Sequence, residues 1–470
     1  QFLDIFCTYF DPHSNYFALD AKANFMSALS TSNLSLGLEL GMNEKDEIIV
    51  SEIIPAGPAA QSKQFDKDDV ILKISDRDGR EYIVSCTPTE TIGDIIFSDA
   101  NREIKITIRK KDGSQRDVAL VKQVMKATEN SVYSFIAEKK SRVGYIKIPS
   151  FYSDFDGESL QGVAQDVATE IAKLSKDGID GLVLDLQDNG GGSMDEAVRL
   201  AGLFIDSGAV AVAVNNNGRQ EILKDYDRGI YYGGPIVILV NGESASASEF
   251  FAGAMQDYRR ALIIGATTLG KASVQTILPV DRKQQEFVKV TVQKFYRITG
   301  ESGQIKGIVP DVHLPVIYDS IMPREKEFKN ALKYDFIKTN VGRIRKYGDI
   351  KKNIVSKSQS RVNASRRFND INAINHQVNR IYSAAMPPIA LRLEDVYKTV
   401  DEISQLWKKV KALSERPTEC RVSNSSFEAS RISADALLSE INSDKMKEAQ
   451  SNPYLEEAID IITDWNAEEN

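Results

Sequence analysis

Residues 233–275 read GGPIVILVNGESASASEFFAGAMQDYRRALIIGATTLGKASVQ. The apolar run Ile236–Val240 predicts a buried strand. The turn-forming pair Asn241-Gly242 ends it, and a helix is expected to open inside Ser244-Ala-Ser-Ala-Ser248. A second apolar strand, Ala261–Gly265, follows that helix. Strands that alternate with helices in this way predict a layered α/β core with a largely parallel sheet.

A serine and a lysine stand at the ends of these two strands. A serine at the mouth of a helix that follows a buried strand lies where backbone N–H groups converge, so an oxyanion formed there is stabilised. Lys271 lies in Gly270-Lys271-Ala272, 25 residues after Ser246. The pair predicts a serine–lysine hydrolase. Three serines compete for the role, because Ser244 is placed to cap the helix and Ser248 to face its interior, so Ser246 is favoured.

Lys271 must be neutral to take a proton from a serine. An ordinary lysine has a pKa of about 10.4, so acting at neutral pH requires lowering it by about three, equivalent to about 4 kcal/mol. The apolar residues Leu262 to Ile264 and Leu269 are expected to supply the dry setting. Gln275, four residues later, is placed to orient Lys271 through its amide oxygen. The alternative for Lys271 is a solvated surface lysine, and the alternative for Gln275 is an ordinary polar strand residue.

Histidine is scarce in this chain. Only His13, His313 and His376 occur, and none stands at a glycine-flanked strand end. A Ser-His-Asp triad remains open, because triad partners lie far apart in many sequences. The context favours lysine as the base.

Outward from this stretch, the chain divides into four expected regions. Residues 1–33 form an N-terminal helical segment, 34–124 a module of short strands, 125–320 the α/β core, and 321–470 a helical domain. Within the last region, the polar stretches Lys351–Arg367 and Glu415–Ser430 are expected to be rich in loops. A length of 470 residues agrees with about three domains.

Composition excludes several classes of function. A net charge of −8 argues against a dedicated nucleic-acid binder. No run of about 18 apolar residues is present to span a membrane. The cysteines Cys7, Cys86 and Cys420 are scattered without metal spacing, so neither a zinc site nor a disulfide framework is expected. The chain begins at Gln1 without a basic and apolar leader, which leaves open whether a targeting segment precedes it.

Several segments, in order, resemble the C-terminal processing (tail-specific) serine protease family, whose larger members carry PDZ modules and a helical extension. They are Asp11-Pro-His-Ser-Asn-Tyr16, Leu36-Gly37-Leu38, Gly144-Tyr-Ile146, Asp185-Leu-Gln-Asp-Asn-Gly-Gly-Gly192, Ser244-Ala-Ser-Ala-Ser-Glu249 and Gly270-Lys-Ala-Ser-Val-Gln275. The glycine loop also invites a nucleotide-binding interpretation, but it has neither the Gly-x-Gly-x-x-Gly nor the Gly-Lys-Ser/Thr pattern.

The resemblance implies a fold and a set of roles. The fold is a ClpP/crotonase-like α/β protease core with an inserted PDZ-like domain and an α-helical C-terminal domain. Ser246, Lys271 and Gln275 would be catalytic, backbone N–H groups of Gly192 and Ala247 would form the oxyanion hole, and Asp257 would support activity, with a structural role favoured. The loop of Leu36, Gly37 and Leu38 would bind a substrate's C-terminal carboxylate through backbone donors and its last side chain between hydrophobic walls, with Ser35 in place of the family's first glycine.

The expected function is therefore that of a serine endopeptidase acting on proteins or peptides through their free C-terminal tails. No metal or organic cofactor is implied. The resemblance implies a bacterial periplasm or cell envelope, and an adaptor protein is a candidate partner for the helical tail. The first alternative is a catalytically silent PDZ-based peptide-binding scaffold. An acyl-CoA enzyme with a related glycine-rich oxyanion loop is a more distant one, since it would not need Ser246 and Lys271 together.

Overall fold

A computed structural model describes most of the chain. The described residues are 2–18, 22, 25–26, 32–43, 45–54, 57–98, 101–126, 131–153, 162–280, 282, 286–342, 344–348, 352–382, 392–433 and 436–469.

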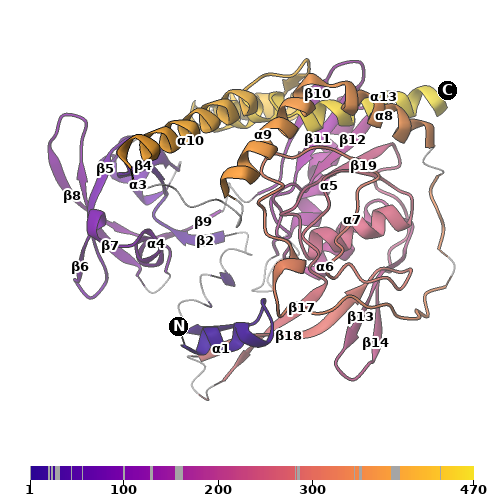
Figure 1. The fold of residues 1–470 in the computed structure, drawn as a ribbon, viewed down its shortest axis with the longest axis horizontal. Helices are drawn as coiled ribbons and strands as arrows, with labels where there is room; N and C mark the ends of the chain where they lie inside the picture. Colours follow the sequence, from indigo (N-terminus) through magenta and orange to yellow (C-terminus); the bar gives the residue numbers. More distant parts are fainter. Residues whose placement is uncertain are drawn as a thin grey trace.

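A seven-stranded sheet runs through the larger body of the molecule, at the right in Figure 1. Its five consecutive strands from β19 to β11 are parallel, and β10 and β20 extend it antiparallel. The spatial order is β19 (Val312–His313), β16 (Leu262–Gly265), β15 (Ile236–Val240), β12 (Gly181–Asp185), β11 (Arg142–Lys147), β10 (Tyr133–Glu138) and β20 (Arg421–Ser423). The predicted parallel α/β core is therefore present.

Helices cover both faces of this sheet. Along β15, Ile236, Ile238 and Val240 face one hydrophobic core, and Val237 and Leu239 face the other. The first core is completed by α5 (Val163–Lys176), α6 (Met194–Gly202) and α7 (Ala247–Asp257). The second is completed by α8 (Lys352–Ala364), α9 (Arg366–Tyr382), the end of α10 (Leu393–Ser414) and α13 (Pro453–Glu469). Burial on both faces explains why the strands read as unbroken apolar runs.

A second sheet lies beside the core and receives the N-terminal segment. Strand β18 (Glu286–Tyr296) pairs with β1 (Asn15–Ala18), β13 (Gly208–Asn215) and β17 (Ser273–Pro279), and β14 (Gln220–Asp225) pairs with β13. Helix α1 spans only Phe2–Phe10. The prediction that residues 1–33 are helical is thus wrong for β1, because pairing with β18 overrides local helical spacing. Residues 19–21, 23–24 and 27–31 lie outside the described residues.

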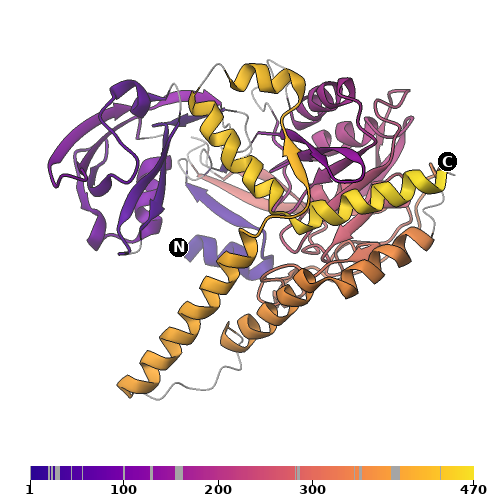
Figure 2. The same cartoon turned by 90° about the horizontal axis from the view of Figure 1, so that it is seen from above.

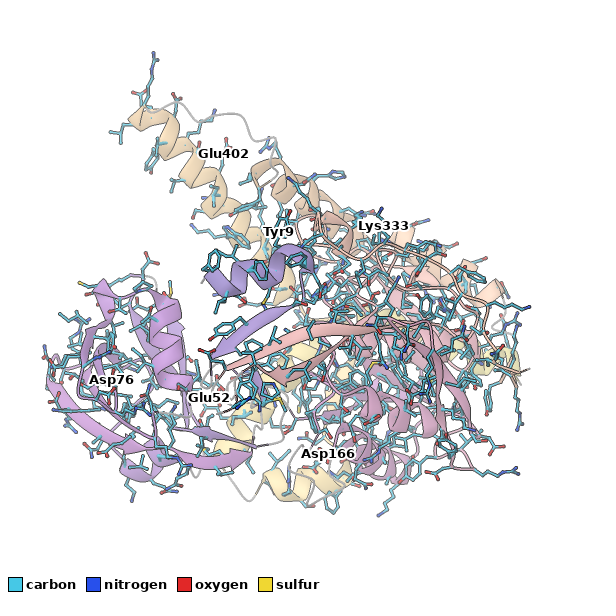
Figure 3. The ribbon with its side chains drawn as sticks, turned by 90° about the horizontal axis from the view of Figure 1, so that it is seen from below. Tyr9, Glu52, Asp76, Asp166, Lys333 and Glu402 are labelled. Carbon is cyan, nitrogen blue, oxygen red and sulfur yellow. The ribbon has the colours of Figure 1, made fainter. Side chains whose placement is uncertain are left out.

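Residues 32–126 form a separate module inserted between β1 and β10, seen to one side of the core in Figures 1 and 3. The pairing of β2 (Ser32–Ser35) with β9 (Gln123–Lys126) joins its entry to its exit. Its sheet runs β3 (Leu38–Met42), β4 (Ile48–Ile53), β5 (Val70–Ser75), β7 (Glu103–Arg109) and β8 (Gln115–Val121), with β6 (Glu81–Ile83) beside β5. The shorter elements are α3 (Pro58–Ser62), the 3-10 turn η1 (Val84–Cys86) and α4 (Thr89–Phe97).

The C-terminal region shares its hydrophobic core with the central sheet instead of forming a separate body. The loop-rich prediction for Lys351–Arg367 is wrong, because α8 buries Ile354, Ser358 and Val362 at a spacing of four. Glu415–Ser430 contains β20 and the start of α11 (Ser426–Ile432).

The remaining elements of this region are the short turn η2 (Glu325–Glu327) and α12 (Ala436–Gln450). Figure 2 shows α10 projecting from the body of the molecule. Within the described ranges, no helix is both long and apolar enough to cross a membrane.

Candidate active site

Ser246 stands at the start of α7, directly after β15 and its turn. Its backbone has φ 55° and ψ −112°, a conformation that L-residues rarely adopt. Such strain is held only where the surrounding structure fixes it, and it is typical of a serine on a strand-to-helix turn. The backbone N–H of Ser246 donates to Glu249 Oε2 at 2.9 Å.

The three serines of the repeat have different surroundings. Ser244 and Ser248 are fully buried, and their hydroxyls donate to the carbonyl oxygens of Leu186 (2.7 Å) and Asn189 (2.8 Å). Ser246 occupies the N-cap position that the sequence had suggested for Ser244, and it is the half-exposed member of the three. Ser246 therefore presents the accessible hydroxyl.

The side chain of Lys271 lies in a dry setting between polar neighbours. Its Nζ donates to the carbonyl oxygen of Ser273 at 2.9 Å and to Gln275 Oε1 at 2.8 Å. Burial lowers the pKa of Lys271 to about 8, against the opposing effect of the nearby Glu249 carboxylate. At pH 7 about a tenth of Lys271 is then neutral, far more than for an ordinary lysine. No hydrogen bond joins Nζ to Ser246 Oγ in this structure, and such bonds commonly form only with substrate.

Glu249 links the serine to the lysine, and sequence reasoning gave it no role. Its Oε2 accepts from the backbone N–H groups of Ser246 and Lys271, both at 2.9 Å. Its Oε1 accepts from Gly270 N at 2.7 Å and from Thr268 Oγ1 at 2.6 Å. Burial raises the pKa of Glu249 to about 7. The spacing Ser246-x-x-Glu249 is that of a capping box, which is the signal that would have found it.

The glycine loop after β12 packs against the start of α7. A Cβ on Gly191 would lie 2.9 Å from Ser246 Cβ and 3.0 Å from Ala247 N, so only glycine fits there. Within the described part of the chain, neither Gly192 N–H nor Ala247 N–H donates to a protein acceptor. Both N–H groups are therefore without a protein acceptor, as the predicted oxyanion hole requires.

Asn189 holds the glycine loop in place by hydrogen bonds, and this is the second role that the sequence analysis missed. It is fully buried, and its Nδ2 donates to the carbonyl oxygen of Ile148 at 2.8 Å. Its Oδ1 accepts from Gly191 N at 2.9 Å, and its carbonyl oxygen accepts from Ala245 N at 3.0 Å. Asn189 thus holds the glycine loop through its side chain and contacts the serine segment through its backbone carbonyl oxygen.

Asp257 lies at the opposite end of α7 from Ser246. Its carboxylate receives the guanidinium of Arg297 on both oxygens, with Nη2 to Oδ1 at 2.5 Å and Nε to Oδ2 at 3.1 Å. Eleven residues of helix span about 16 Å, so Asp257 does not touch the reacting groups. Its contact fastens the end of α7 to the residue after β18.

The predicted peptide-binding residues lie in the inserted module. Leu36 and Leu38 are buried in the hydrophobic core of the module, so their side chains do not form the expected walls of an open pocket. Gly37 has φ 71°, and its N–H donates to Ser35 Oγ at 3.0 Å. Strand β3, which begins at Leu38, is an edge strand of the described sheet.

The histidines lie elsewhere. His313 and His376 are exposed on β19 and α9, and the Nε2 of His13 pairs with Glu325 Oε2 at 2.8 Å. None of the three hydrogen-bonds to Ser246. Among the residues that the structure describes, no group of three or more His, Cys, Asp or Glu side chains is arranged to hold a metal ion.

Comparison with known proteins gives a consistent result. Residues 142–314 match the sequence profile described as peptidase family S41. The chain is 34% identical over 345 residues to a tail-specific protease of Haemophilus influenzae, an alignment that covers 72% of this chain and 48% of the relative. It is 31% identical over 324 residues to a probable CtpA-like serine protease of Staphylococcus aureus, with coverage of 68% and 61%. The chain thus spans about half to three fifths of the length of these curated relatives.

Among solved structures, the photosystem II D1 C-terminal processing protease is similar to this chain. The sequence identity is 26%, the match covers 66% of this chain and 80% of that one, and the TM-score is 0.41.

Proposed function

We propose that this chain is a serine endopeptidase with Ser246 as nucleophile and Lys271 as general base. The match of residues 142–314 to the peptidase family S41 profile supports this proposal. The observation that carries the proposal is the contrast among the three serines. Ser244 and Ser248 are buried with their hydroxyls bound to carbonyl groups, whereas Ser246 is accessible beside a desolvated lysine.

The proposed chemistry uses the contacts described above. Neutral Lys271 takes the proton of Ser246 Oγ as that oxygen forms a bond to the substrate's carbonyl carbon. The developing oxyanion accepts from the N–H groups of Gly192 and Ala247. The Lys271 ammonium then returns the proton to the leaving amine as the peptide bond breaks. Lys271 next takes a proton from water as the water oxygen forms a bond to the acyl carbon, and it gives that proton to Ser246 Oγ as the ester bond breaks. Gln275 Oε1 and the carbonyl oxygen of Ser273 hold Nζ during these steps.

We further propose that the core is of the ClpP/crotonase type and that residues 32–126 form a PDZ-like module that binds substrate tails. The open edge of β3 supports the second proposal, because an extended peptide can add to such an edge as a further strand. The substrate class would then be proteins or peptides with free C-termini.

An adaptor protein on the C-terminal helices and a bacterial envelope location complete the proposal. The first is supported by apolar side chains exposed on α10, namely Leu393, Tyr397 and Val400. The second rests on the bacterial relatives alone.

The test of the proposed activity is cleavage of an unstructured protein by the wild-type chain and by Ser246→Ala. The substitution removes one hydroxyl and almost no volume, so we expect an unchanged fold and a loss of kcat of about 10³-fold or more. Ser244→Ala is the matched control, and it should retain most of the activity if it folds. Turnover by a folded Ser246→Ala protein would move the nucleophile elsewhere. Binding without cleavage by the wild type would favour a peptide-binding scaffold.

A further inference from the structure

A chain of hydrogen bonds leads from Lys271 to the N-terminal loop. Lys271 Nζ donates to Gln275 Oε1 at 2.8 Å, and Gln275 Nε2 donates to Thr291 Oγ1 at 2.9 Å. The next contact, between Thr291 Oγ1 and Asp11 Oδ2, measures 2.5 Å. The chain therefore connects the candidate base to a carboxylate 260 residues earlier in the sequence.

Asp11 is firmly held at the far end of this chain. It is 7% exposed, and its Oδ2 also accepts from Ser14 Oγ at 2.8 Å. Ser14 Oγ in turn accepts from Thr291 N at 3.4 Å. Two further contacts hold the loop to the core, namely the pairing of β1 with β18 and the contact of His13 with Glu325. The loop follows directly after α1, the helix that carries Tyr9 in Figure 3.

The donors and acceptors along the chain can be arranged in only one direction. A carboxylate only accepts hydrogen bonds, so the hydroxyl proton of Thr291 must point to Asp11. The oxygen of Thr291 then accepts from the amide NH₂ of Gln275. The NH₂ group also contacts Ser273 Oγ at 2.9 Å, but a serine hydroxyl can donate as well as accept, so Thr291 is the contact that sets the direction. With its NH₂ group so engaged, Gln275 turns its carbonyl oxygen toward Lys271.

This orientation matters for a lysine that acts as a base. Neutral Lys271 has two N–H bonds and one lone pair, and acceptors at Gln275 Oε1 and the Ser273 carbonyl oxygen take the two N–H bonds. The lone pair stays free for the proton of Ser246. A reversed Gln275 amide would donate an N–H to Nζ and occupy that lone pair.

We propose that Asp11, acting through Thr291, is a positioning residue that fixes the Gln275 amide and thereby keeps the lone pair of Lys271 directed to Ser246. This inference rests on the proposed function, because it assigns a role within the Ser246–Lys271 reaction. A residue of the N-terminal loop would thus help to orient the catalytic lysine, although this loop is far in sequence from residues 142–314.

The chain of hydrogen bonds from Lys271 through Gln275 and Thr291 to Asp11, called the relay below, should affect how the rate depends on pH. The charged groups that act on Lys271 are Glu249, Glu325 and Asp11, which favour its ammonium form, and Lys289, which opposes it. A reversed amide stabilises the neutral amine, so loss of the relay lowers the pKa of Lys271 further while making its lone pair less available. In a plot of kcat against pH, the maximal value reached at high pH (the plateau) should fall. The rise of kcat on the acidic side (the acidic limb) should move to lower pH. A merely structural defect would leave the limb in place.

The test compares Thr291→Val, which removes the hydroxyl without changing charge, with Thr291→Ser, which keeps it. Cleavage of an unstructured protein by the full chain should show kcat for Thr291→Val lower by about 10-fold to 100-fold, with KM little changed. Thr291→Ser should behave as wild type. The matched control is Thr276→Val, which makes the same change on the opposite face of β17 and should leave kcat unchanged.

A second readout is independent of cleavage. Titration of Lys271 by NMR, with ¹³C-labelled lysine and Lys271→Met for assignment, should give a lower pKa in Thr291→Val than in Thr291→Ser. That result would support the relay even if the wild type cleaved nothing, in which case only the proposed function fails. Equal lysine titration in the two variants, or a lower plateau with an unmoved limb, would overturn the relay. Thr291→Ala serves the same comparison if Thr291→Val does not fold.

Discussion

Two glycine-containing loops of this molecule are candidates to bind a negatively charged oxygen, and they differ in the state of their backbone N–H groups. In the core, the described structure leaves the N–H groups of Gly192 and Ala247 without protein acceptors. In the inserted module, the N–H of Gly37 is already taken by Ser35 Oγ. The comparison teaches that glycine content alone does not make an anion site. The site depends on whether the surrounding side chains leave the N–H groups free.

The glycine loop of the core is also held by more hydrogen bonds from buried side chains than the loop at Gly37 in the module. Asn189 and Glu249 are almost fully buried, and each accepts or donates several hydrogen bonds that hold the backbone of the site. Such preorganisation favours stabilisation of charge in a transition state. We therefore expect substitutions in the core site to have large effects on catalysis and substitutions in the module loop to have small effects on binding.

The largest effect is expected at Lys271. Lys271→Arg keeps a positive charge, but an arginine cannot lose its proton near neutrality. We expect kcat for an unstructured protein to fall by about 10³-fold or more, as much as in Lys271→Ala. Circular dichroism would check that each variant is folded. Substantial activity in Lys271→Arg would mean that Lys271 has an electrostatic or structural role. It would contradict the claim that the core site uses Lys271 as its base.

A smaller effect is expected at Glu249. Glu249→Gln replaces one acceptor oxygen with an NH₂ group that faces existing donors, so the contacts to Ser246 and Lys271 or to Gly270 weaken. It also removes an anion that favours the Lys271 ammonium, so the pKa of Lys271 falls. We expect kcat to fall by about 10-fold to 100-fold, with the acidic limb at lower pH.

Exposed Glu221 on β14 offers a control of the same chemistry. Glu221→Gln should leave both the plateau and the limb as in wild type. An unchanged profile in folded Glu249→Gln would show that this buried carboxylate does not organise the site.

The smallest effect is expected in the module. Ser35→Gly removes the hydroxyl that occupies Gly37 N–H and restores the glycine of the family pattern, so a terminal carboxylate gains a donor. We expect binding of peptides with an apolar free C-terminus to the Ser246→Ala protein to strengthen by about 2-fold to 10-fold. Amidation of the peptide should cancel the gain.

Fluorescence titration with the two peptides measures this difference. Equal affinity for acid and amide in both proteins would argue against tail recognition by this loop. The proposal for the core site would be unaffected by that result.

The sequence was most informative where a role depends on local spacing. The strand Ile236–Val240 and the placement of Ser246 and Lys271 after buried strands follow from short-range patterns. The roles of Glu249 and Asn189 depend on contacts that span the loops, and that of Asp11 depends on a contact with Thr291, 280 residues away. No periodicity encodes such long-range contacts.

The loop at Gly37 shows that a local sequence pattern can also fail to predict the position of its own side chains. Leu36 and Leu38 were expected to line a pocket, but a short alternation of leucine and glycine does not say which face a leucine turns toward the core. In the structure both leucines fill the core of the module.

The most direct test of the central claim, that a buried lysine acts as the base, is the pH dependence of kcat/KM for cleavage of an unstructured protein. The base must be deprotonated, so activity should be low in acid, should reach its plateau through a limb near the Lys271 pKa of about 8, and should stay level above it. His13→Gln should leave that limb in place. A limb near the ordinary histidine pKa of about 6.5 that disappears in a histidine variant would contradict the account.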